Sequence, residues 1–447
     1  MANVIKLRKG LDINLKGKAE QTVVAQIHPQ ECGLMPCDFP GLVPKVVVKP
    51  GDKVLAGDAL FADKMDPRVL FASPVSGEVT EVTRGERRKV LSVRVKADKE
   101  TSYRSFSIPK TDTIDGDAVI NILLEAGLFG YVNQLPYAVT TRPDTAPKGI
   151  FVSALRDMPL AGDFEYELQG NEEAFQTGLS MLSKIATVYL GIGASQEAKA
   201  LREARDVELT VFDGPCPAGN VGVQVNNISP VNKGEVVWTV DPTAVIFFGR
   251  LFLTGKVDLT RRVAIAGEVN NPSYVEAPVG TPISALLDGF RKEGYYRVIN
   301  GNPLTGRKSD GDDFLGAHTS EVTVVPEGDK IDELAGWIMP RFKQFSVSRS
   351  YFSWLFGKRE YTMDTRRKGG ERHMIMSGEY DKVFPMDIYP EYLIKSIIAG
   401  DIDKQEQLGI YEVAPEDFAL AEFVDSSKLE LQKIVREGLD ILRKENA

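Results

Sequence analysis

The spacing of apolar and polar positions differs along the chain and divides it into several parts. Residues 41–82 contain short Val-rich runs separated by Pro-Gly, Ala-Gly and Ser-Gly pairs. Short apolar runs bounded by turn residues are typical of β-strands joined by tight turns. The sequence therefore predicts a compact β module near the N-terminus, and we assign it residues 1–104.

From about residue 105 the pattern becomes that of an α/β domain. Residues 117–130 repeat apolar side chains at helical spacing, whereas residues 149–155 and 186–193 are apolar runs of strand length. Strands that alternate with helices predict a mainly parallel sheet. We therefore predict a Rossmann-like domain over residues 105–256.

The predicted strand at 186–193 ends in a turn with two glycines. Gly191 and Gly193 precede a helical pattern, which is the context of a dinucleotide-binding turn, but Gln196 stands where the third glycine of that motif belongs. Without this glycine the helix cannot pack closely on the strand. The sequence favours a turn without a ligand, and we predict no dinucleotide site.

Two further regions follow. Residues 260–290 read as a strand, an Asn-Asn-Pro turn, a second strand and a short helix opened by Thr281 and Pro282, which resembles the β-grasp module named for soluble ligand binding. We assign this module residues 257–328 and expect a scaffold rather than a pocket. The last region, residues 329–447, ends in helices, and Ser427 with Glu430 predicts a capping box.

Composition excludes several classes of function. The 54 Lys and Arg residues against 63 Asp and Glu give a net charge of −9, the wrong sign for a nucleic-acid-binding protein. Asp241 and Arg250 interrupt the most apolar window, residues 236–253, which therefore does not predict a membrane span. No secretory signal follows the first basic residues, so we expect a cytoplasmic protein.

Two segments combine residue types that favour binding. Residues 212–222, FDGPCPAGNVG, predict a tight irregular loop whose N–H groups face a ligand or a neighbouring chain. Residues 340–361 interleave aromatic and basic side chains, which suits a membrane interface or a partner surface but equally a buried strand pair. The candidate loop residues are Asp213, Gly214, Pro215, Pro217 and Gly219, and the candidate contact residues are Phe342, Arg349, Tyr351, Phe352 and Trp354.

Residues 49–61, KPGDKVLAGDALF, with residues 72–82, ASPVSGEVTEV, resemble the barrel-sandwich fold of lipoyl and biotinyl carrier domains. In such carriers a modified lysine lies at a hairpin tip. Lys64 does not have the matching offset from the two motifs, so we interpret it as an ordinary surface lysine.

Over its whole length the chain resembles the A-subunit family of the bacterial sodium-translocating NADH:quinone oxidoreductase (Na+-NQR). The resemblance rests on residues 212–222, on VINGNPLTG at 298–306 and on FGRLFLTG at 248–255. It implies a peripheral subunit, without a transmembrane segment, on the cytoplasmic side of the bacterial inner membrane. The implied complex oxidises NADH, reduces quinone and exports sodium. The implied partners are its other subunits, above all the membrane-embedded quinone and flavin subunit.

The family usually has a His where this chain has Cys216.

The resemblance also implies that FMN, FAD, riboflavin and iron centres belong to partner subunits. Related flavin-binding subunits of complex I cradle FMN in a loop with consecutive glycines, whereas residues 131–134 here are Tyr-Val-Asn-Gln.

An iron–sulfur cluster needs about four thiolates, and the chain has three cysteines, Cys32, Cys37 and Cys216. Cys32 and Cys37 lack the second ligand pair of a structural zinc site. We predict no metal and no flavin in this chain.

Three hypotheses for the chain remain. The first is a docking scaffold that is not catalytic alone, since we find no motif for independent hydrolase or transferase catalysis. The second is a subunit with its own quinone pocket, because aromatic and aliphatic walls suit a quinone ring. The third is a flavoprotein with a divergent site, which the missing glycines disfavour. The candidate quinone residues are Phe129, Tyr131, Leu135 and Tyr137.

Overall fold

The largest sheet of the computed structural model has seven strands in the order β1-β14-β13-β12-β15-β10-β11. The structure describes residues 3–111, 113–329, 338–356 and 359–446. The first five strands in that order run parallel, and β10 and β11 are antiparallel to their neighbours. The strands are β1 (Asn3–Lys6), β10 (Val132–Leu135), β11 (Val139–Thr140), β12 (Ile150–Ser153), β13 (Val188–Gly193), β14 (Glu208–Asp213) and β15 (Val237–Val240).

Two helices of this α/β region, α3 and α6, pack closely because of two glycines. A Cβ on Gly249 of α6 would lie 1.7 Å from the Ala174 oxygen of α3, and a Cβ on Gly178 of α3 would lie 2.1 Å from the Val245 oxygen of α6. Only glycine permits this approach of two helix backbones. The helices of the region are α1 (Gly116–Glu125), α2 (Phe164–Leu168), α3 (Glu172–Leu182), α4 (Lys199–Arg202), α5 (Val221–Ile228) and α6 (Pro242–Thr254).

The sequence predictions for this region are confirmed for its main elements. The predicted helix at 117–130 is α1, capped by Asp115, whose carboxylate accepts a hydrogen bond from the Ala118 N–H, and a 3-10 turn at Phe129–Tyr131 follows. The two predicted strands are β12 and β13, which are parallel neighbours. The chain is therefore an α/β protein in this part.

A second sheet has six strands in the order β19-β18-β20-β16-β17-β2. The β16-β17 hairpin and the short helix α7 (Ile283–Leu286) correspond to the predicted strand-turn-strand-helix order. Buried side chains of β16, β17, α7 and β20 form its separate apolar core. The strands are β2 (Val23–Gln26), β16 (Thr260–Gly267), β17 (Ser273–Pro278), β18 (Tyr296–Asn300), β19 (Arg307–Lys308) and β20 (Glu321–Pro326).

Two small antiparallel sheets build the N-terminal β module, in the orders β3-β9-β8-β5 and β4-β6-β7. Lys64 is exposed in the connection between β6 and β7. The strands are β3 (Glu31–Leu34), β4 (Pro44–Val46), β5 (Lys53–Val54), β6 (Ala59–Asp63), β7 (Leu70–Ala72), β8 (Gly77–Arg84) and β9 (Val90–Ala97).

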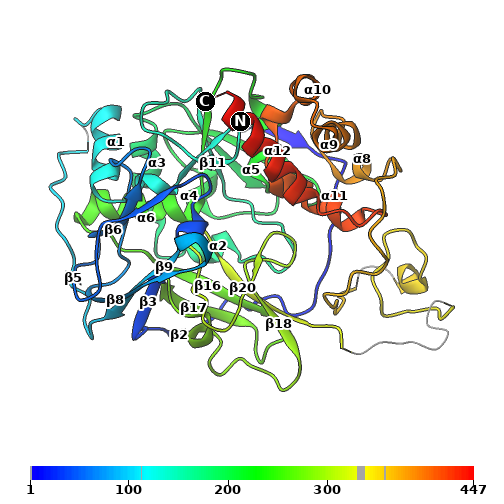
Figure 1. The fold of residues 1–447 in the computed structure, drawn as a ribbon, viewed down its shortest axis with the longest axis horizontal. Coiled ribbons are helices and arrows are strands. Elements are labelled where there is room, and N and C mark those ends of the chain that lie inside the picture. Colours follow the sequence, from blue (N-terminus) through cyan, green and yellow to red (C-terminus); the bar gives the residue numbers. More distant parts are fainter. Residues whose placement is uncertain (1–2, 112, 330–337, 357–358, 447) are drawn as a thin grey trace.

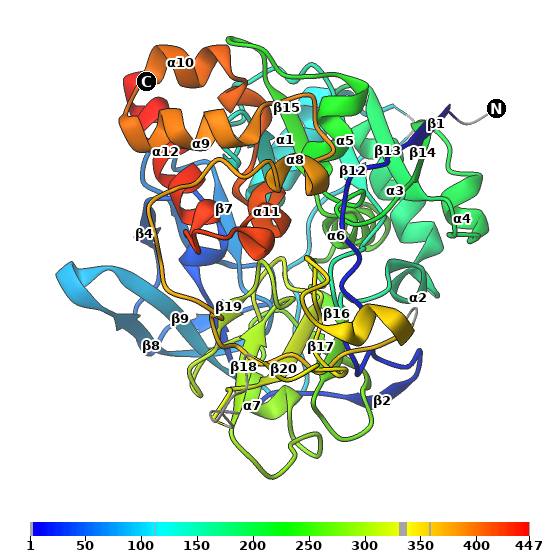
Figure 2. The ribbon, with the colours of Figure 1, turned by 90° about the vertical axis from the view of Figure 1, so that its right-hand side faces the viewer.

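The first strands of the chain belong to the other regions. β1 pairs in parallel with β14 of the seven-stranded sheet, and β2 pairs with β17 of the six-stranded sheet. Figure 2 shows this dark-blue segment running from β1, beside β14, to β2. The N-terminal segment thus crosses between two sheets before the β module begins, although the sequence pattern placed it in that module.

Helices of the last region lie beside the α/β region, with α12 and α9 adjacent (Figure 1). The predicted capping box is wrong. α12 begins at Leu431, and the Ser427 hydroxyl accepts a hydrogen bond from the Ile375 N–H instead of capping the helix. The helices are α8 (Tyr380–Val383), α9 (Pro390–Ala399), α10 (Ile402–Gln407), α11 (Ala419–Val424) and α12 (Leu431–Glu445). Over the described residues, none of the helices is long and apolar enough to cross a membrane.

Candidate functional site

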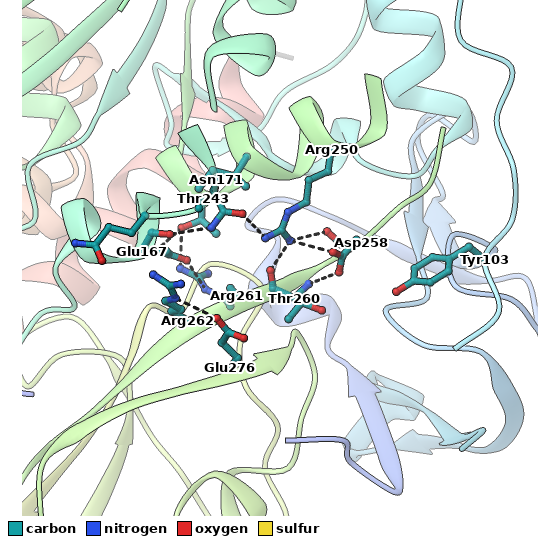
Figure 3. A pocket seen from close by; sticks show the side chains of 13 residues that line it. Tyr103, Glu167, Asn171, Thr243, Arg250, Asp258, Thr260, Arg261, Arg262 and Glu276 are labelled. Carbon is teal, nitrogen blue, oxygen red and sulfur yellow. Dashed lines mark hydrogen bonds and ion pairs between the residues drawn. The ribbon is translucent and has the colours of Figure 1, made fainter. Parts of the chain in front are cut away.

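A polar cavity of about 310 Å³ lies where the α/β region meets the six-stranded sheet (Figure 3). Its walls come from the α2–α3 connection, from α6 and from the first residues of β16. The lining residues are Tyr103, Glu167, Gln169, Gly170, Asn171, Thr243, Ile246, Arg250, Asp258, Thr260, Arg261, Arg262 and Glu276. Because arginines and carboxylates dominate this lining, its charge balance decides what the cavity can bind.

The floor of the cavity is a buried network centred on Glu167. Its Oε2 accepts hydrogen bonds from Arg156 Nη1 at 2.7 Å and from the Thr243 hydroxyl at 3.0 Å. The Thr243 oxygen in turn accepts from Arg156 Nη2 at 2.7 Å and from Arg261 Nη2 at 2.9 Å. Arg261 belongs to β16 and its side chain is fully buried, while Glu167 belongs to α2. The network therefore ties the two regions together.

Asp241 completes the network and remains ionised. Its Oδ1 lies 3.4 Å from Arg156 Nη2 and accepts the Thr243 N–H at 2.9 Å, which caps α6. Burial is the largest single cause and raises the pKa of the Asp241 carboxyl, but the nearby positive charges, with Arg156 first, and the Thr243 N–H together lower it by more, so the net shift is downward. Burial lowers the pKa of Arg156, and Glu167 with Asp241 raises it by more. Each charge thus stabilises the ionised form of its partners.

The other two arginines of the cavity are also paired with carboxylates. Arg250 donates to the Thr260 carbonyl at 2.6 Å and to the Asn171 Oδ1 at 2.8 Å, and it lies 3.3 Å from Asp258 Oδ2. Arg262 donates through Nε to Glu276 Oε1 at 3.1 Å. Three arginines in the lining therefore face three carboxylates. This geometry suits ion pairing between the two regions better than the binding of an anionic ligand.

The predicted binding loop at 212–222 contacts the chain's own N-terminal segment. Asp12 Oδ1 accepts the Cys216 N–H at 3.0 Å, Asp157 Oδ2 accepts the Gly219 N–H at 2.9 Å, and the Cys216 carbonyl accepts the Leu11 N–H. Two N–H groups of the loop are thus bonded to carboxylates of the same chain. Asp213 and Gly214 are exposed, Pro215 and Gly219 are half-buried, and Pro217 is buried.

Cys216 is buried in this loop between apolar side chains and the carboxylates of Asp12 and Asp157. It is 2% exposed, and its Sγ is 3.7 Å from Met158 Sδ. Burial is the main cause that raises the pKa of the Cys216 thiol. Burial also raises the pKa of the Asp157 carboxyl to about 6. A buried thiol with a raised pKa is a poor nucleophile, which favours a packing role for Cys216.

The two-glycine turn after β13 is filled by an amide side chain. Gln196 Oε1 accepts the Gly193 N–H at 2.8 Å, and Gln196 Nε2 donates to the Ala154 carbonyl at 3.0 Å. A Cβ on Gly191 would lie 1.9 Å from Gln224 Oε1. The glutamine that replaces the third glycine of the motif therefore bonds the N–H that a phosphate would need.

The four candidate quinone residues lie in three different parts of the core. Phe129 is fully buried with its ring 5.6 Å from that of Trp238, and Tyr131 packs against the rings of Phe39, Phe247 and His318. Leu135 belongs to a smaller cluster beside α5, and the half-buried Tyr137 packs against Tyr411. Phe129 and Tyr131 belong to the same large apolar core but pack against different rings, and Leu135 and Tyr137 lie elsewhere.

The segment that matches the flavin loop of the related subunits is packed against the N-terminal β module. A Cβ on Gly130 would lie 2.2 Å from the Phe71 ring, and Tyr131 is 2% exposed. A flavin phosphate needs backbone N–H groups that a ligand can approach. The residues present here do not fit that group.

Cys32 is buried and Cys37 is exposed, with Arg307 Nη1 2.7 Å from Cys37 Sγ. Among the residues that the structure describes, no group of three His, Cys, Asp or Glu side chains is arranged to hold a metal ion. Of the predicted contact residues, Phe342, Arg349, Phe352 and Trp354 are exposed and Tyr351 is half-buried.

Family models match three regions of the chain, and all three models describe the same family. The model described as the NqrA N-terminal barrel-sandwich hybrid domain matches residues 5–98. The NqrA second alpha/beta domain matches residues 114–257, and the NQRA C-terminal domain matches residues 262–311. The three matches follow the order of the small sheets, the seven-stranded sheet and the six-stranded sheet along the chain.

Two full-length relatives carry the same description. The chain is 36% identical over 446 residues to the A subunit of the Na(+)-translocating NADH-quinone reductase of Vibrio atlanticus (strain LGP32), and the match covers 99% of this chain and 100% of that protein. It is 34% identical over 447 residues, with the same coverage, to the corresponding protein of Yersinia pestis bv. Antiqua (strain Angola). Among solved structures, an air-oxidized NAD+-reducing [NiFe]-hydrogenase aligns over 77% of this chain and 67% of that chain, at 12% identity and a TM-score of 0.36, which is too distant to support an argument.

Proposed function

The chain belongs to the A-subunit family of the Na+-translocating NADH-quinone reductases, and on this premise we propose that it is the docking subunit of such a complex. In this role it braces the membrane-embedded quinone and flavin subunit from the cytoplasmic side of the inner membrane. NADH oxidation, quinone reduction and sodium export take place in the assembled complex. The full-length similarity to relatives that are named as subunits carries the proposal.

The flavins and iron centres belong, in this proposal, to the other subunits. Two observations support this division of labour. The Gly193 N–H, in the turn most like a nucleotide site, is bonded to Gln196 of the same chain. The segment equivalent to the flavin loop lies against Phe71 of the β module. The turn at Gly193 and the segment equivalent to the flavin loop, where related folds bind phosphate groups, are therefore both occupied by side chains of this chain.

A comparison of the complex with and without this chain tests the proposal. We expect the purified chain to be colourless and unable to oxidise NADH. We expect membranes that contain the remaining subunits to lose NADH-dependent quinone reduction and sodium uptake until the chain is added back. Full activity of the complex without the chain, or a flavin absorbance band in the purified chain, would overturn the docking role.

The same purified chain decides the quinone hypothesis. A short-chain quinone is titrated while tryptophan and tyrosine fluorescence is followed, with Tyr131→Phe as the matched variant. The Tyr131 hydroxyl has no hydrogen-bond partner in the described structure, so this substitution preserves the packing. If a competing analogue blocks saturable quenching and Tyr131→Phe weakens it, the chain is a quinone-binding subunit and the scaffold hypothesis is wrong. Absence of saturable quenching is the result that the docking role predicts.

A further inference from the structure

A short stretch of the chain has a charge opposite to that of the whole. Residues 338–356 together with Arg359 and Glu360 contain four Lys or Arg residues and one acidic residue, Glu360, whereas the chain has a net charge of −9. We call these residues the basic aromatic surface. Its cations are Arg341, Lys343, Arg349 and Arg359.

This surface also concentrates exposed apolar side chains. Of the 23 large apolar side chains that are exposed among the described residues, eight lie between residues 338 and 356. Trp354 is 46% exposed, and Leu355 and Phe356 are each 58% exposed. Scattered exposed apolar residues need no explanation, but a contiguous group of them marks an interaction site.

The cations and the rings are interleaved. The guanidinium of Arg349 lies over the Trp354 ring at 5.4 Å, that of Arg341 over Tyr351 at 5.4 Å, and that of Arg359 over Phe356 at 5.8 Å. Each of these basic side chains therefore lies beside an aromatic ring, so positive charge and apolar area occupy the same face.

The rings also contact one another, and the turn at their centre is held by the backbone. Phe342 contacts Phe352 at 6.1 Å and Phe356 at 5.6 Å between ring centroids. The Phe352 N–H donates to the Pro340 carbonyl at 3.0 Å. The aromatic side chains thus form a cluster rather than separate exposed residues.

The surface is anchored on the body of the protein by other aromatic residues. Phe345 points inward, with its ring 5.3 Å from that of Tyr361 and 5.9 Å from that of Phe423 on α11. The Tyr361 N–H donates to the Asn14 carbonyl, and the Tyr361 carbonyl accepts the Lys16 N–H. Figure 1 shows this yellow segment at the right-hand edge, away from both large sheets, and Figure 2 shows it on the face toward the viewer. The anchor fixes which side chains face outward.

From this arrangement we propose that the basic aromatic surface binds a bilayer surface that contains anionic phospholipids. Such a bilayer combines negative headgroups with an apolar layer directly beneath them, and lysine, arginine and tryptophan are the side chains that suit this boundary. A protein partner would need one patch that is both acidic and apolar, whereas an anionic bilayer offers negative headgroups above an apolar layer over its whole surface. The charge and the apolar area together therefore favour lipid.

This inference rests on the docking role proposed above and deepens it, because the chain would bind the bilayer directly as well as its partner subunits. It is tested on the purified full-length chain with vesicles alone. A negative result therefore leaves the assembly experiment unaffected, and a failed assembly experiment leaves the vesicle result unaffected.

The test is sedimentation with phosphatidylcholine vesicles that contain about 30% phosphatidylglycerol or none. We expect binding to the anionic vesicles, weaker binding to neutral ones, and a loss of at least about tenfold for the double variant Trp354→Ala/Phe356→Ala, since two large apolar side chains are removed. The matched control is Tyr389→Ala/Tyr392→Ala, which removes an exposed aromatic pair at 69% and 55% exposure at the start of α9, outside the surface. It should bind as the unaltered chain does.

Three outcomes would overturn the lipid assignment. They are equal binding to neutral and anionic vesicles, equal losses in both double variants, and absence of vesicle binding by the unaltered chain. If vesicle binding is absent and Trp354→Ala/Phe356→Ala prevents assembly of the complex while Tyr389→Ala/Tyr392→Ala does not, the surface belongs to a protein partner. Unchanged circular dichroism of all variants establishes that each of them has folded.

Discussion

Two regions of the molecule use arginine in opposite ways. At the junction of the α/β region with the six-stranded sheet, Arg261 is buried, the Arg156 side chain is only 11% exposed, and each lies close to carboxylates. In the basic aromatic surface, Arg349 and Arg359 lie over aromatic rings, and four cations stand against one carboxylate, that of Glu360. The first arrangement is neutral within itself, and the second has more basic than acidic residues.

The difference follows from solvation. A buried charge without a partner is very costly, so the junction contains cation and anion together, and little of its charge is offered to the outside. An exposed guanidinium is solvated by water and needs no carboxylate, and its flat face can rest on a ring. A balanced interior network therefore indicates a connection within the chain, whereas an unbalanced exposed one indicates contact with something else.

The largest effect should come from breaking the buried network. Glu167→Gln keeps the side-chain shape but leaves Arg156 and Arg261 with less compensation, and we expect a loss of about 3–5 kcal/mol in unfolding free energy. Glu276→Gln removes a carboxylate that is 26% exposed and pairs with Arg262, and its cost should not exceed about 1 kcal/mol. Urea unfolding of both variants, followed by circular dichroism, measures the difference. Equal losses would mean that burial does not distinguish the two pairs.

A smaller effect at the same network should depend on pH. The pKa of Asp241 is lower in the folded chain than its ordinary value of 3.8. The carboxylate therefore contributes stability that is complete above the unfolded pKa and is lost as the pH falls through the folded pKa. Because the Asp241 side chain is 27% exposed, water screens this contribution.

Asp241→Asn removes that contribution at every pH. The difference in unfolding free energy between the unaltered chain and Asp241→Asn should be greatest near neutral pH and should shrink in acid. Urea unfolding at a series of pH values measures it. A difference that stays constant from neutral pH to about pH 3, below the ordinary Asp pKa, would show that the charge of Asp241 does not act through the arginines.

The sequence predicted the elements of the fold better than its connections. The apolar periodicity of 117–130 and the strand-length runs at 149–155 and 186–193 are local signals, and the corresponding elements are α1, β12 and β13. β1 and β2 are four-residue strands without a decisive pattern, and only their partners β14 and β17 determine where they lie. The capping box failed because Ser427 bonds to Ile375, far away in sequence.

The arginine network was not predicted, although one signal for it was visible. Glu167 and Arg261 are distant in sequence, and no local pattern pairs them. Asp241 and Arg250 were noted as charges that interrupt an apolar window, and charged residues next to buried segments require partners. The aromatic and basic residues of 340–361 were predicted either as a contact surface or as a buried strand pair, and sequence alone could not separate the two. The exposure of Phe342, Phe352 and Trp354 argues against the buried strand pair, and contact with a membrane or a partner stays a prediction.

The smallest effect separates charge from stacking at the exposed surface. Arg349→Gln removes one charge near the bilayer and should weaken binding to anionic vesicles about fivefold. Arg349→Lys keeps the charge but loses the flat stacking over the Trp354 ring, so we expect a weakening of about twofold to threefold. Both are measured by vesicle sedimentation, and neither should change urea unfolding, because Arg349 is exposed. If the lysine variant bound as weakly as the glutamine variant, stacking rather than charge would hold the surface to lipid, and the contrast with the buried network would rest on geometry instead of charge balance.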